Sequence, residues 1–500
     1  MQLGSQVPVG GDLSSIRGGR VHVVGLGGTG VRGLVPLLLD RGVRVSGSDK
    51  DDSPVIAKFR RDGVECSVGH SDRNVLPGTD LVLISAAVTP DNPEVRVAKQ
   101  RSIAVLKYAQ CLGFLMGEKE GIAISGTHGK TTTSAMVCSV LVHAGRDPSF
   151  VIGGDHSDLG GGSRSGNGSH FVAEACEFDR SFLNLRPRAT VVTNIEEDHL
   201  DYFESLSDIQ GAFRQFVGLL PEDGFLVYSA DDPNSCRLPE SSRARSNSFS
   251  LEPGKGDWWA EDVEFRGEGS TFDVIGPGGL RVPFELVVPG DHNVRNALAC
   301  TAVCSWAGIP LEEIAAGLRR FRGVRRRFDV LARKPCTVVD DYAHHPTEVE
   351  TVLRAARQTY PDRQLVCVFQ PHQYSRLRRM LEGFADALSL ADDVIITQVY
   401  RARDSEADVR SVQASVLNKA VGSRGVSSSY AEDFPRAIEL LEAVARTDSV
   451  VIFLGAGDVT DLAGEFASAL SGGRVRLERE PRAPSTSVVP AIVHATPGLC

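Results

Sequence analysis

One short segment of the sequence combines glycines, a lysine and hydroxyl groups at a spacing that suits phosphate binding. It reads GTHGKT over residues 126–131 and follows an apolar run that ends at Ser125. Glycine opens the backbone so that N–H groups and a following helix N-terminus reach phosphate oxygens. Lys130 adds a positive charge for the β- and γ-phosphates of a nucleotide, and Thr131 offers a hydroxyl to Mg²⁺. Because Ile124 stands where the general P-loop has glycine, this is a shorter GxxGKT form, and a chance turn is the alternative.

A second glycine loop, GLGGTG, occupies residues 25–30. Its Gly25-x-Gly27-x-x-Gly30 spacing is typical of dinucleotide binding, and Asp49 follows about twenty residues later. Many tight turns in α/β proteins share this pattern. The residues alone therefore favour a nicotinamide dinucleotide and another phosphate ligand, such as a nucleoside diphosphate, equally.

Acidic residues after a nearby strand-like run offer metal ligands. Glu174 and Glu177 lie at the end of that run, and His199 follows the segment TNIEED. A nucleotide-bound Mg²⁺ takes few protein ligands, mainly carboxylates, because it keeps its waters. Glu174 is therefore a candidate metal ligand. His199 would be an unusual ligand for a hard ion, and a histidine bonded to a neighbouring carboxylate is the alternative interpretation.

Two further segments place polar side chains directly after apolar runs. DDYAHHPTE spans residues 340–348 and QPHQYSR spans residues 370–376. The carboxyl ends of parallel strands are where α/β sheets place ligand sites. The adjacent His344 and His345 lack a spaced third ligand, which argues against a structural zinc site. Arg376 would bind a carboxylate or phosphate through a bidentate fork, and a surface arginine is the alternative.

These segments need strands and helices to position them. Apolar runs around each glycine loop predict two strand–turn–helix units, with helices at 31–39 and 135–141. Alternating β and α units predict parallel sheets with crossover helices, and so an α/β fold. Residues 153–169 and 237–257 are predicted to be loops, the first a flexible one. The predicted strands are 21–24, 43–47, 80–85, 122–125, 170–174, 189–194, 225–229, 286–288, 337–340, 365–369, 393–397 and 449–454.

Length and composition limit what the whole chain does. Its 500 residues are 42% hydrophobic and 24% charged, which is ordinary for globular proteins and predicts about three domains. The net charge of −10 argues against a chain-wide nucleic-acid footprint. We expect no membrane helix and no signal peptide, because neither kind of apolar run is present. Ten cysteines without a CxxC pair indicate reduced thiols and a cytoplasmic location.

The motifs taken together resemble those of the Mur ligases. The chain contains, in the order and spacing of that family, GTHGKTTT, EACE, TNIEEDH, GDHNVRNA, RRFD, DDYAHHPTE, QPHQYSR and GAGD. The resemblance implies a Rossmann-like UDP-sugar-binding domain at 20–116, a central P-loop-type ATP-binding domain at 117–325 and a Rossmann-like amino-acid-binding domain at 326–476. It leaves 1–19 as a leader and 477–500 as a tail, both predicted to be disordered. The early glycine loop would then hold the pyrophosphate of a UDP-sugar rather than NAD.

The sequences of these motifs are most similar to those in the branch of this family that joins L-alanine to the lactyl carboxylate of UDP-N-acetylmuramate. The resemblance implies an acyl-phosphate intermediate, release of ADP and phosphate, and a role in peptidoglycan synthesis, cell shape and cell division. ATP and Mg²⁺, or Mn²⁺ in its place, are the implied cofactors, and a monomer or weak homodimer is expected. The alternatives are a recycling ligase that attaches a murein tripeptide to the same UDP-sugar, an NAD-dependent dehydrogenase and a non-catalytic nucleotide-binding module.

The resemblance also assigns residues. The implied catalytic residues are Lys130, His344 and His345. The implied ATP-binding residues are Gly126, Thr127, His128, Gly129, Lys130, Thr131, Thr132, His292, Asn293, Asn296, Arg327 and Asp341. The implied substrate-binding residues are Gly25, Gly27, Gly28, Thr29, Gly30, Asp49, His70, Ser85, His199, Tyr342, His344, His372 and Arg376. Two Mg²⁺ ions are implied, the first with Thr131 as a ligand and the second with Glu174 and His199 as ligands.

Several positions depart from the residues usual in the family. They are Ala86, Tyr108, Gln110, Cys176, Phe178 and Arg295. None of these departures removes Lys130, Thr131, Glu174 or Asp341. The resemblance therefore still implies an active enzyme.

Overall fold

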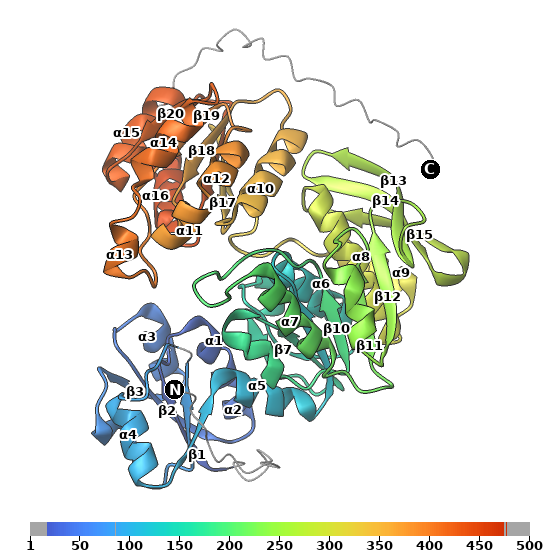
Figure 1. The fold of residues 1–500 in the computed structure, drawn as a ribbon, viewed down its shortest axis with the longest axis vertical. Coiled ribbons are helices and arrows are strands. Elements are labelled where there is room, and N and C mark those ends of the chain that lie inside the picture. Colours follow the sequence, from blue (N-terminus) through green and yellow to red (C-terminus); the bar gives the residue numbers. More distant parts are fainter. Residues whose placement is uncertain (1–17, 86, 475–476, 478–500) are drawn as a thin grey trace.

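The computed structural model describes residues 18–85, 87–474 and 477 of the chain. These residues form three α/β units that follow one another along the sequence, each with its own sheet (Figure 1). The predicted α/β fold is confirmed, while the boundaries at 116/117 and 325/326 stay predictions. The predicted tail apart from Leu477, and residues 1–17 of the predicted leader, lie outside the described residues. None of the described helices is long and apolar enough to cross a membrane.

The N-terminal unit is a parallel sheet in the order β3-β2-β1-β4-β5, which is the Rossmann-like arrangement predicted from the sequence. The glycine loop 25–30 leads from its central strand to the first helix. The strands are β1 Arg20–Val24, β2 Arg44–Asp49, β3 Glu65–Val68, β4 Leu81–Ile84 and β5 Ala104–Lys107. The helices are α1 Thr29–Arg32, α2 Leu34–Asp40, α3 Pro54–Arg61, α4 Pro93–Gln100 and α5 Tyr108–Gly117.

One predicted helix is divided in the structure. The sequence predicts a single helix over 31–39, but α1 and α2 are separate helices that meet at Gly33. A Cβ atom at Gly33 would lie 2.9 Å from Val151 Cγ1 of the central unit. The glycine therefore allows two units of the protein to approach closely, which the apolar pattern of the helix does not reveal.

Glu94, near the start of α4, is fully buried in the N-terminal unit. It accepts hydrogen bonds from Ser48 Oγ at 2.6 Å and Asn74 Nδ2 at 2.5 Å, and its Oε2 lies 3.1 Å from His70 Nδ1. Burial opposes its ionisation, but hydrogen bonds from His22, Ser48 and Asn74 outweigh burial and lower the pKa of Glu94 to about 2. An interior carboxylate thus orients His70, one of the predicted substrate-binding residues.

Replacing Glu94 with glutamine is expected to lower the free energy of unfolding by about 3 kcal/mol at neutral pH, since each pKa unit corresponds to about 1.4 kcal/mol. The folded pKa of about 2 lies below the ordinary value of 4.5. The carboxylate therefore stabilises the fold fully above its ordinary pKa, and this contribution disappears as the pH falls toward the folded pKa. Urea unfolding of both proteins at neutral and acidic pH measures the difference. The exposed Glu65→Gln is the control, and equal losses from the two variants at neutral pH would contradict the prediction.

The central unit contains a ten-stranded sheet in the order β15-β14-β13-β12-β11-β10-β6-β9-β7-β8. Its strands run parallel from β7 to β13, and β8, β14 and β15 extend the two edges in antiparallel pairing. The strands are β6 Glu120–Ser125, β7 Ser149–Val151, β8 Ser163–Arg164, β9 His170–Glu174, β10 Ala189–Val192, β11 Phe225–Ser229, β12 Arg245–Ser250, β13 Trp258–Arg266, β14 Gly269–Gly276 and β15 Leu280–Leu286. The helices are α6 Lys130–His143, α7 Leu206–Val217, α8 Asp291–Trp306 and α9 Leu311–Arg319.

Three predictions for this unit are wrong in part. The segment 237–257, predicted as a loop, contains β12, which pairs with strands on both sides. Its buried Ser248 and Ser250 are satisfied by hydrogen bonds to acidic side chains, so a polar sequence forms an interior strand. The predicted strand 286–288 shares only Leu286 with β15, which ends there, and the predicted loop 153–169 includes the short edge strand β8.

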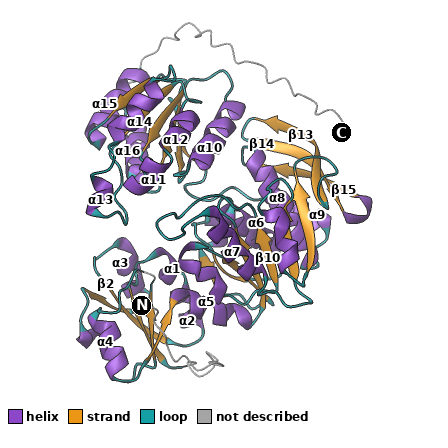
Figure 2. Ribbon diagram, viewed as in Figure 1, coloured by secondary structure: helices purple, strands orange, loops and turns teal. Residues whose placement is uncertain are grey.

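The C-terminal unit is a six-stranded sheet in the order β16-β17-β21-β18-β19-β20, parallel except for β16. Apolar clusters on both faces of the sheet bury it between helices (Figure 2). The strands are β16 Asp329–Ala332, β17 Thr337–Asp341, β18 Leu365–Phe369, β19 Asp393–Ile396, β20 Ser427–Tyr430 and β21 Val450–Leu454. The helices are α10 Pro346–Thr359, α11 Tyr374–Arg379, α12 Leu381–Leu388, α13 Glu406–Val409, α14 Ala414–Gly422, α15 Phe434–Val444 and α16 Val459–Ser471.

Candidate active site between the central and C-terminal domains

The GTHGKT segment connects β6 to α6, as predicted. Gly126 has φ +133° and Gly129, which caps α6, has φ +82°, and both values favour glycine. A Cβ atom at Gly126 would also lie 2.0 Å from Thr193 Oγ1. Because the loop leads directly into a helix of fourteen residues, its N–H groups and the helix N-terminus are available to an anion.

Lys130 is held at the start of α6 by oxygen acceptors. Its Nζ donates to Gly126 O, to Thr127 O at 3.0 Å and to Glu177 Oε1 at 3.1 Å. Burial opposes the charge, but the Glu177 carboxylate outweighs burial and raises the pKa of Lys130 above its usual range. The lysine therefore stays charged where a phosphate would enter.

Thr131 and Glu174, predicted as ligands of the first and the second Mg²⁺, are brought together. Thr131 Oγ1 donates to Glu174 Oε2 at 2.9 Å, and Gly153 N donates to the same oxygen at 2.8 Å. A hydroxyl and a carboxylate are the oxygen donors that Mg²⁺ prefers, so these two residues fit that ion. His199, predicted to share the second ion with Glu174, lies beside another acid, with Nε2 4.0 Å from Glu177 Oε1.

A cavity of about 550 Å³ opens beside the GTHGKT segment and is lined by both the central and the C-terminal domain. Most of the predicted ATP-binding residues line it, namely His128, Gly129, Thr131, Thr132, His292, Asn293, Asn296, Arg327 and Asp341. The sequence prediction missed other lining residues, among them Asn194, Asp231, Asp232, Asn234, Arg295 and Glu348. Asp231 and Asp232 lie two and three residues after the end of β11, so the rule that ligand sites lie at strand ends could have found them.

The start of α8 forms one wall of this cavity. Asn293 Nδ2 donates to Pro289 O at 2.7 Å, and Asn296 Nδ2 donates to Asn293 Oδ1 at 3.3 Å. Burial lowers the pKa of His292 to about 4, so this ring is neutral near physiological pH. Arg295, where the family usually has an apolar residue, lies 3.6 Å from Asp231, which gives its charge a partner.

Asp341 ends β17 and faces the cavity from the C-terminal domain. It accepts hydrogen bonds from Phe328 N at 2.7 Å and Ala343 N at 2.8 Å. Burial outweighs the attraction of Arg327 and raises the pKa of Asp341 to about 6. The Arg327 guanidinium lies 5.2 Å from the centre of the Tyr342 ring, so the predicted Arg327, Asp341 and Tyr342 are brought together.

The Michaelis constant for ATP is expected to rise in the wild-type protein as the pH falls below about 6, the pKa of Asp341, because protonation removes the charged acceptor. Asp341→Asn is expected to raise that constant by about tenfold or more at every pH, since its amide N–H₂ faces a backbone N–H donor. Steady-state kinetics between pH 5 and 8 measure both effects. Asp340→Asn, next to Asp341 but bonded to Thr460, is the control, and an unaltered ATP constant in Asp341→Asn would contradict the assignment.

The predicted residues of the C-terminal domain gather at a second point of contact with the central domain. Arg376 is buried and its Nη2 donates to Asp198 Oδ1 at 2.7 Å, so the alternative of a surface arginine is wrong. Arg376 Nη1 lies 3.2 Å from His372 Nδ1, and the rings of His372 and His344 are 5.5 Å apart. Burial lowers the pKa of His372 to about 3, and the nearby cations add to this.

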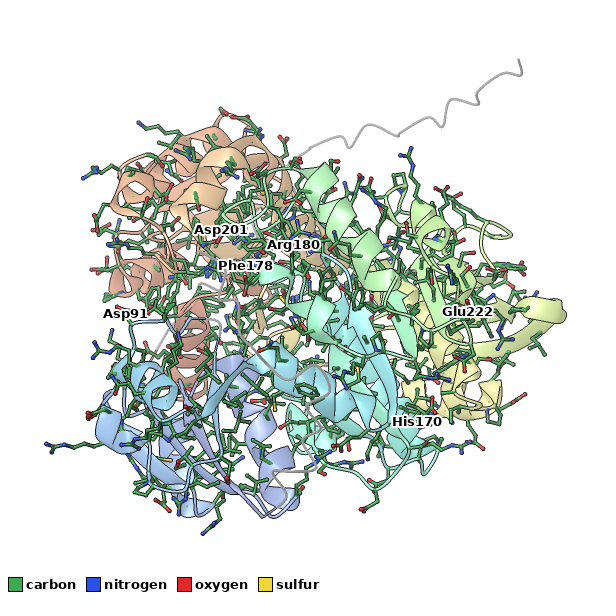
Figure 3. The ribbon with its side chains drawn as sticks, turned by 60° about the horizontal axis from the view of Figure 1, so that its bottom comes forward. Asp91, His170, Phe178, Arg180, Asp201 and Glu222 are labelled. Atoms are coloured by element: carbon green, nitrogen blue, oxygen red, sulfur yellow. The ribbon has the colours of Figure 1, made fainter. Side chains whose placement is uncertain are left out.

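One loop of the central domain carries most of these contacts. This loop, residues 193–203, also supports the GTHGKT segment, since Asn194 Oδ1 accepts from His128 N at 2.8 Å. Asp201, near the end of this loop, lies close to Phe178 (Figure 3). The guanidinium group of Arg403 contacts both residues, 4.2 Å from the centre of the Phe178 ring and 3.3 Å from Asp201 Oδ2. Its contacts with the C-terminal domain join Glu196 to Thr347, Glu197 to His345, Asp198 to Arg376, Leu200 to Arg379 and Asp201 to Arg403.

The early glycine loop forms a separate site in the N-terminal domain. Gly27 N donates to Asp49 Oδ2 at 2.7 Å, so the predicted acid is hydrogen-bonded to the backbone of the glycine loop. A Cβ atom at Gly25 would lie 3.0 Å from Ser85 Oγ, and one at Gly30 would lie 3.3 Å from the Tyr108 ring. The loop, Asp49 and Ser85 are thus brought together, with His70 held nearby through Ser48. Ala86 and the side chain of Thr29 lie outside the described part of the structure.

Comparison with known proteins agrees with this geometry. The Mur ligase family catalytic domain matches residues 20–120, the Mur ligase middle domain matches 124–304, and the Mur ligase glutamate ligase domain matches 326–457. The chain is 38% identical to a UDP-N-acetylmuramate–L-alanine ligase of Clostridium acetobutylicum over 91% of this chain and 99% of that protein. The chain belongs to the Mur ligase family.

Solved structures give the same result. The chain matches the crystal structure of a UDP-N-acetylmuramate–alanine ligase from Thermotoga maritima with a TM-score of 0.77 and 30% identity, over 91% of this chain and 99% of that one. A murein peptide ligase from Psychrobacter arcticus matches with a TM-score of 0.69 at 24% identity, over 90% and 98% of the two chains, which shows a shared fold. The three-domain architecture predicted from the motifs is therefore that of a Mur ligase.

Proposed function

We propose that the protein is an ATP-dependent ligase that joins L-alanine to the lactyl carboxylate of UDP-N-acetylmuramate, releasing ADP and phosphate. The observation that carries this proposal is the cavity between the central and C-terminal domains, where the GTHGKT loop faces Arg327 and Asp341. The relative from Clostridium acetobutylicum, aligned along nearly its whole length, carries the name of this activity. A dehydrogenase or a non-catalytic module would leave the charged Lys130 and its paired acids without a use.

The proposed division of labour follows the three domains. The loop 25–30, closed by Asp49, would bind the pyrophosphate of the UDP-sugar through backbone N–H groups. The central domain would bind ATP, and the C-terminal domain would supply Arg376 for the carboxylate of the amino acid. We place the protein in the cytoplasm, in peptidoglycan synthesis and hence in cell shape and division, because ATP and a UDP-sugar are both cytoplasmic compounds. A monomer or weak homodimer without nucleic-acid or membrane partners remains part of the proposal.

The proposed reaction has two steps. A lactyl carboxylate oxygen attacks the γ-phosphorus of ATP, and the bond between this phosphorus and the bridging oxygen of the β-phosphate breaks. ADP departs, and the lactyl group is then an acyl phosphate. The alanine amine then attacks the acyl carbon, and phosphate departs. Lys130 would neutralise charge on the transferred phosphoryl group, which is the main task of a phosphoryl-transfer site. Two Mg²⁺ or Mn²⁺ ions, one held by Thr131 and the other by Glu174 and His199, would supply additional neutralisation of the phosphates.

The alanine amine must lose a proton before it attacks, and we assign that proton to His344. Its Nδ1 lies 3.0 Å from Tyr342 O and 3.1 Å from Glu348 Oε2, so Nδ1 carries the hydrogen and Nε2 keeps its lone pair. The carboxylate behind the ring would stabilise the imidazolium that forms. His345, the other predicted candidate, has a pKa lowered to about 4 by burial and by the charge of His128, which makes it a weak base.

An ADP-release assay with UDP-N-acetylmuramate and ATP tests the proposal. The assay compares L-alanine, a murein tripeptide and no acceptor. We expect ADP release with L-alanine at a rate far above the other two arms, together with UDP-N-acetylmuramoyl-L-alanine by mass spectrometry. Turnover with the tripeptide alone would establish the recycling ligase instead, and no turnover in any arm would reject a ligase.

A further inference from the structure

Two histidines and an acid meet where the central and C-terminal domains touch. One ring nitrogen each from His128 and His345 and one carboxylate oxygen of Glu196 lie within 4.8 Å of one another. His128 belongs to the GTHGKT loop, Glu196 to the loop 193–203, and His345 caps the start of α10. Among the described residues this group alone gathers three histidine, cysteine or acidic side chains at such distances. We call it the seam cluster.

Each member of the seam cluster already has a partner on its far side. His128 Nδ1 lies 3.2 Å from Glu348 Oε1, which directs Nε2 toward Glu196 Oε2 at 3.5 Å. His345 Nε2 lies 3.1 Å from Glu197 O, so this nitrogen carries the hydrogen. The Nδ1 lone pair accepts from Thr347 N at 3.3 Å, a long hydrogen bond that a bound ion would displace. Metal-binding histidines usually have a carboxylate or a backbone carbonyl behind their second ring nitrogen, and Glu348 and Glu197 O lie in these positions here.

The carboxylate of the seam cluster is oriented as well. Thr347 Oγ1 donates to Glu196 Oε2 at 2.7 Å, which fixes the side chain toward the histidines. Outer partners of this kind align ligands before an ion arrives. The seam cluster is therefore an organised set of two imidazole nitrogens and one carboxylate oxygen.

The two carboxylates next to His128, those of Glu196 and Glu348, favour a positive charge in the seam cluster. Burial opposes protonation of His128, but Glu196 and Glu348 outweigh burial and raise the pKa of His128 to about 9. Both ring nitrogens of His128 are buried and make no hydrogen bond of good geometry. A proton thus balances the two carboxylates, and a divalent cation at Nε2 would balance them in its place while Nδ1–H still faces Glu348.

We propose that the seam cluster binds Zn²⁺ through His128, Glu196 and His345. Two imidazoles and one carboxylate, with a fourth position open, are a common ligand set for zinc. Mg²⁺ prefers oxygen ligands throughout, so the site is distinct from the Thr131 and Glu174 pair. His128 and Glu196 line the 550 Å³ cavity, so the bound ion joins the two domains and occupies the entrance to the phosphate-binding loop. Zinc would then inhibit a ligase of this kind, although its binding requires no ligase activity.

The sequence alone argues against zinc because His344 and His345 have no spaced third ligand. The fold supplies that ligand from segments about 150 to 220 residues away, which no spacing rule describes. The three ligands come together only while the two domains are in contact, because His345 belongs to the C-terminal domain and the other two ligands belong to the central domain. Binding is therefore expected to raise the thermal midpoint of the protein as well.

Titration of the full-length protein with Zn²⁺ and with Co²⁺, without nucleotide, tests the proposal. We expect one Zn²⁺ bound per chain and visible Co²⁺ absorption typical of nitrogen and oxygen ligands in a four- or five-coordinate site. His345→Gln and Glu196→Gln should each weaken Zn²⁺ binding at least about a hundredfold, and Thr347→Val, which removes only an outer partner, about tenfold. The control His143→Gln alters an exposed histidine at the end of α6 and should bind zinc like the wild type.

Each outcome decides the proposal. Loss of binding in His345→Gln and Glu196→Gln, with unaltered metal-free melting curves and normal binding by His143→Gln, supports it. Equal binding by all variants overturns it, as does a Co²⁺ spectrum with strong thiolate charge transfer, which would place the ion at cysteines. Binding of no zinc by the wild type also overturns it. None of these measurements uses UDP-N-acetylmuramate or ATP, so a failure here is separate from a failure of the proposed ligase activity.

Discussion

Lys130→Ala is expected to lower the turnover number about a thousandfold while leaving the binding of UDP-N-acetylmuramate unaltered, because a single positioned cation or donor at a charged transition state contributes a factor of about a hundred to a thousand or more. The UDP-sugar would bind at the loop 25–30, in another domain. ADP release measures the first quantity, and calorimetric titration with UDP-N-acetylmuramate measures the second.

Replacing Lys130 is also expected to destabilise the fold, and this effect must be distinguished from the loss of turnover. Removing Lys130 leaves the buried Glu177 carboxylate without its cation, which is expected to destabilise the fold by several kcal/mol. The double variant Lys130→Ala/Glu177→Gln removes that unpaired charge and should recover much of the stability without recovering turnover. Recovery of turnover in the double variant would show that Lys130 supports the fold rather than the reaction.

Arg376→Ala is expected to cause the second large effect, a loss of at least about a hundredfold in kcat/KM for L-alanine and about 3–5 kcal/mol in stability. The buried Asp198 loses its partner at 2.7 Å, and the proposed binding group for the amino-acid carboxylate disappears.

Arg378→Ala is the matched control. Arg378 lies on the same short helix, but it is half exposed and lies 3.9 Å from Asp408, a distant ion pair that contributes about 0–1 kcal/mol. Initial rates over a range of alanine concentrations, with urea unfolding of both variants, check the pair. Similar kinetic losses in the two variants would remove Arg376 from the proposed alanine site.

Much of the fold follows from local sequence. The strand 365–369 is a continuous apolar run and the strand 170–174 has an apolar centre, and the structure has both with the predicted bounds. The strand β12 was missed because its buried serines rely on hydrogen bonds that they donate to Asp231 and Asp257 rather than on apolar side chains. Pattern methods detect hydrophobic burial, and they do not detect burial that is made possible by polar partners.

The sequence predicted the individual segments of the site, but it did not predict how these segments contact one another. The GTHGKT loop, Glu174 and the ends of β17 and β18 carry recognisable residue types at strand ends, so each could be located. The contacts of Glu348 with His128 and of Asp198 with Arg376 could not. They depend on how one folded domain docks against another, and residue spacing carries no information about that docking.

The loop 193–203 has a consequence for engineering the protein. Its length is fixed at both ends, because Asn194 supports the GTHGKT segment while residues from Glu196 to Asp201 contact the C-terminal domain. An inserted residue would shift every later contact out of register, so this short stretch should tolerate no change in length. A compound that separates this loop from α11 would disturb the contact between the two domains that line the 550 Å³ cavity. If that cavity binds ATP as proposed, such a compound would inhibit the protein without competing with cellular ATP.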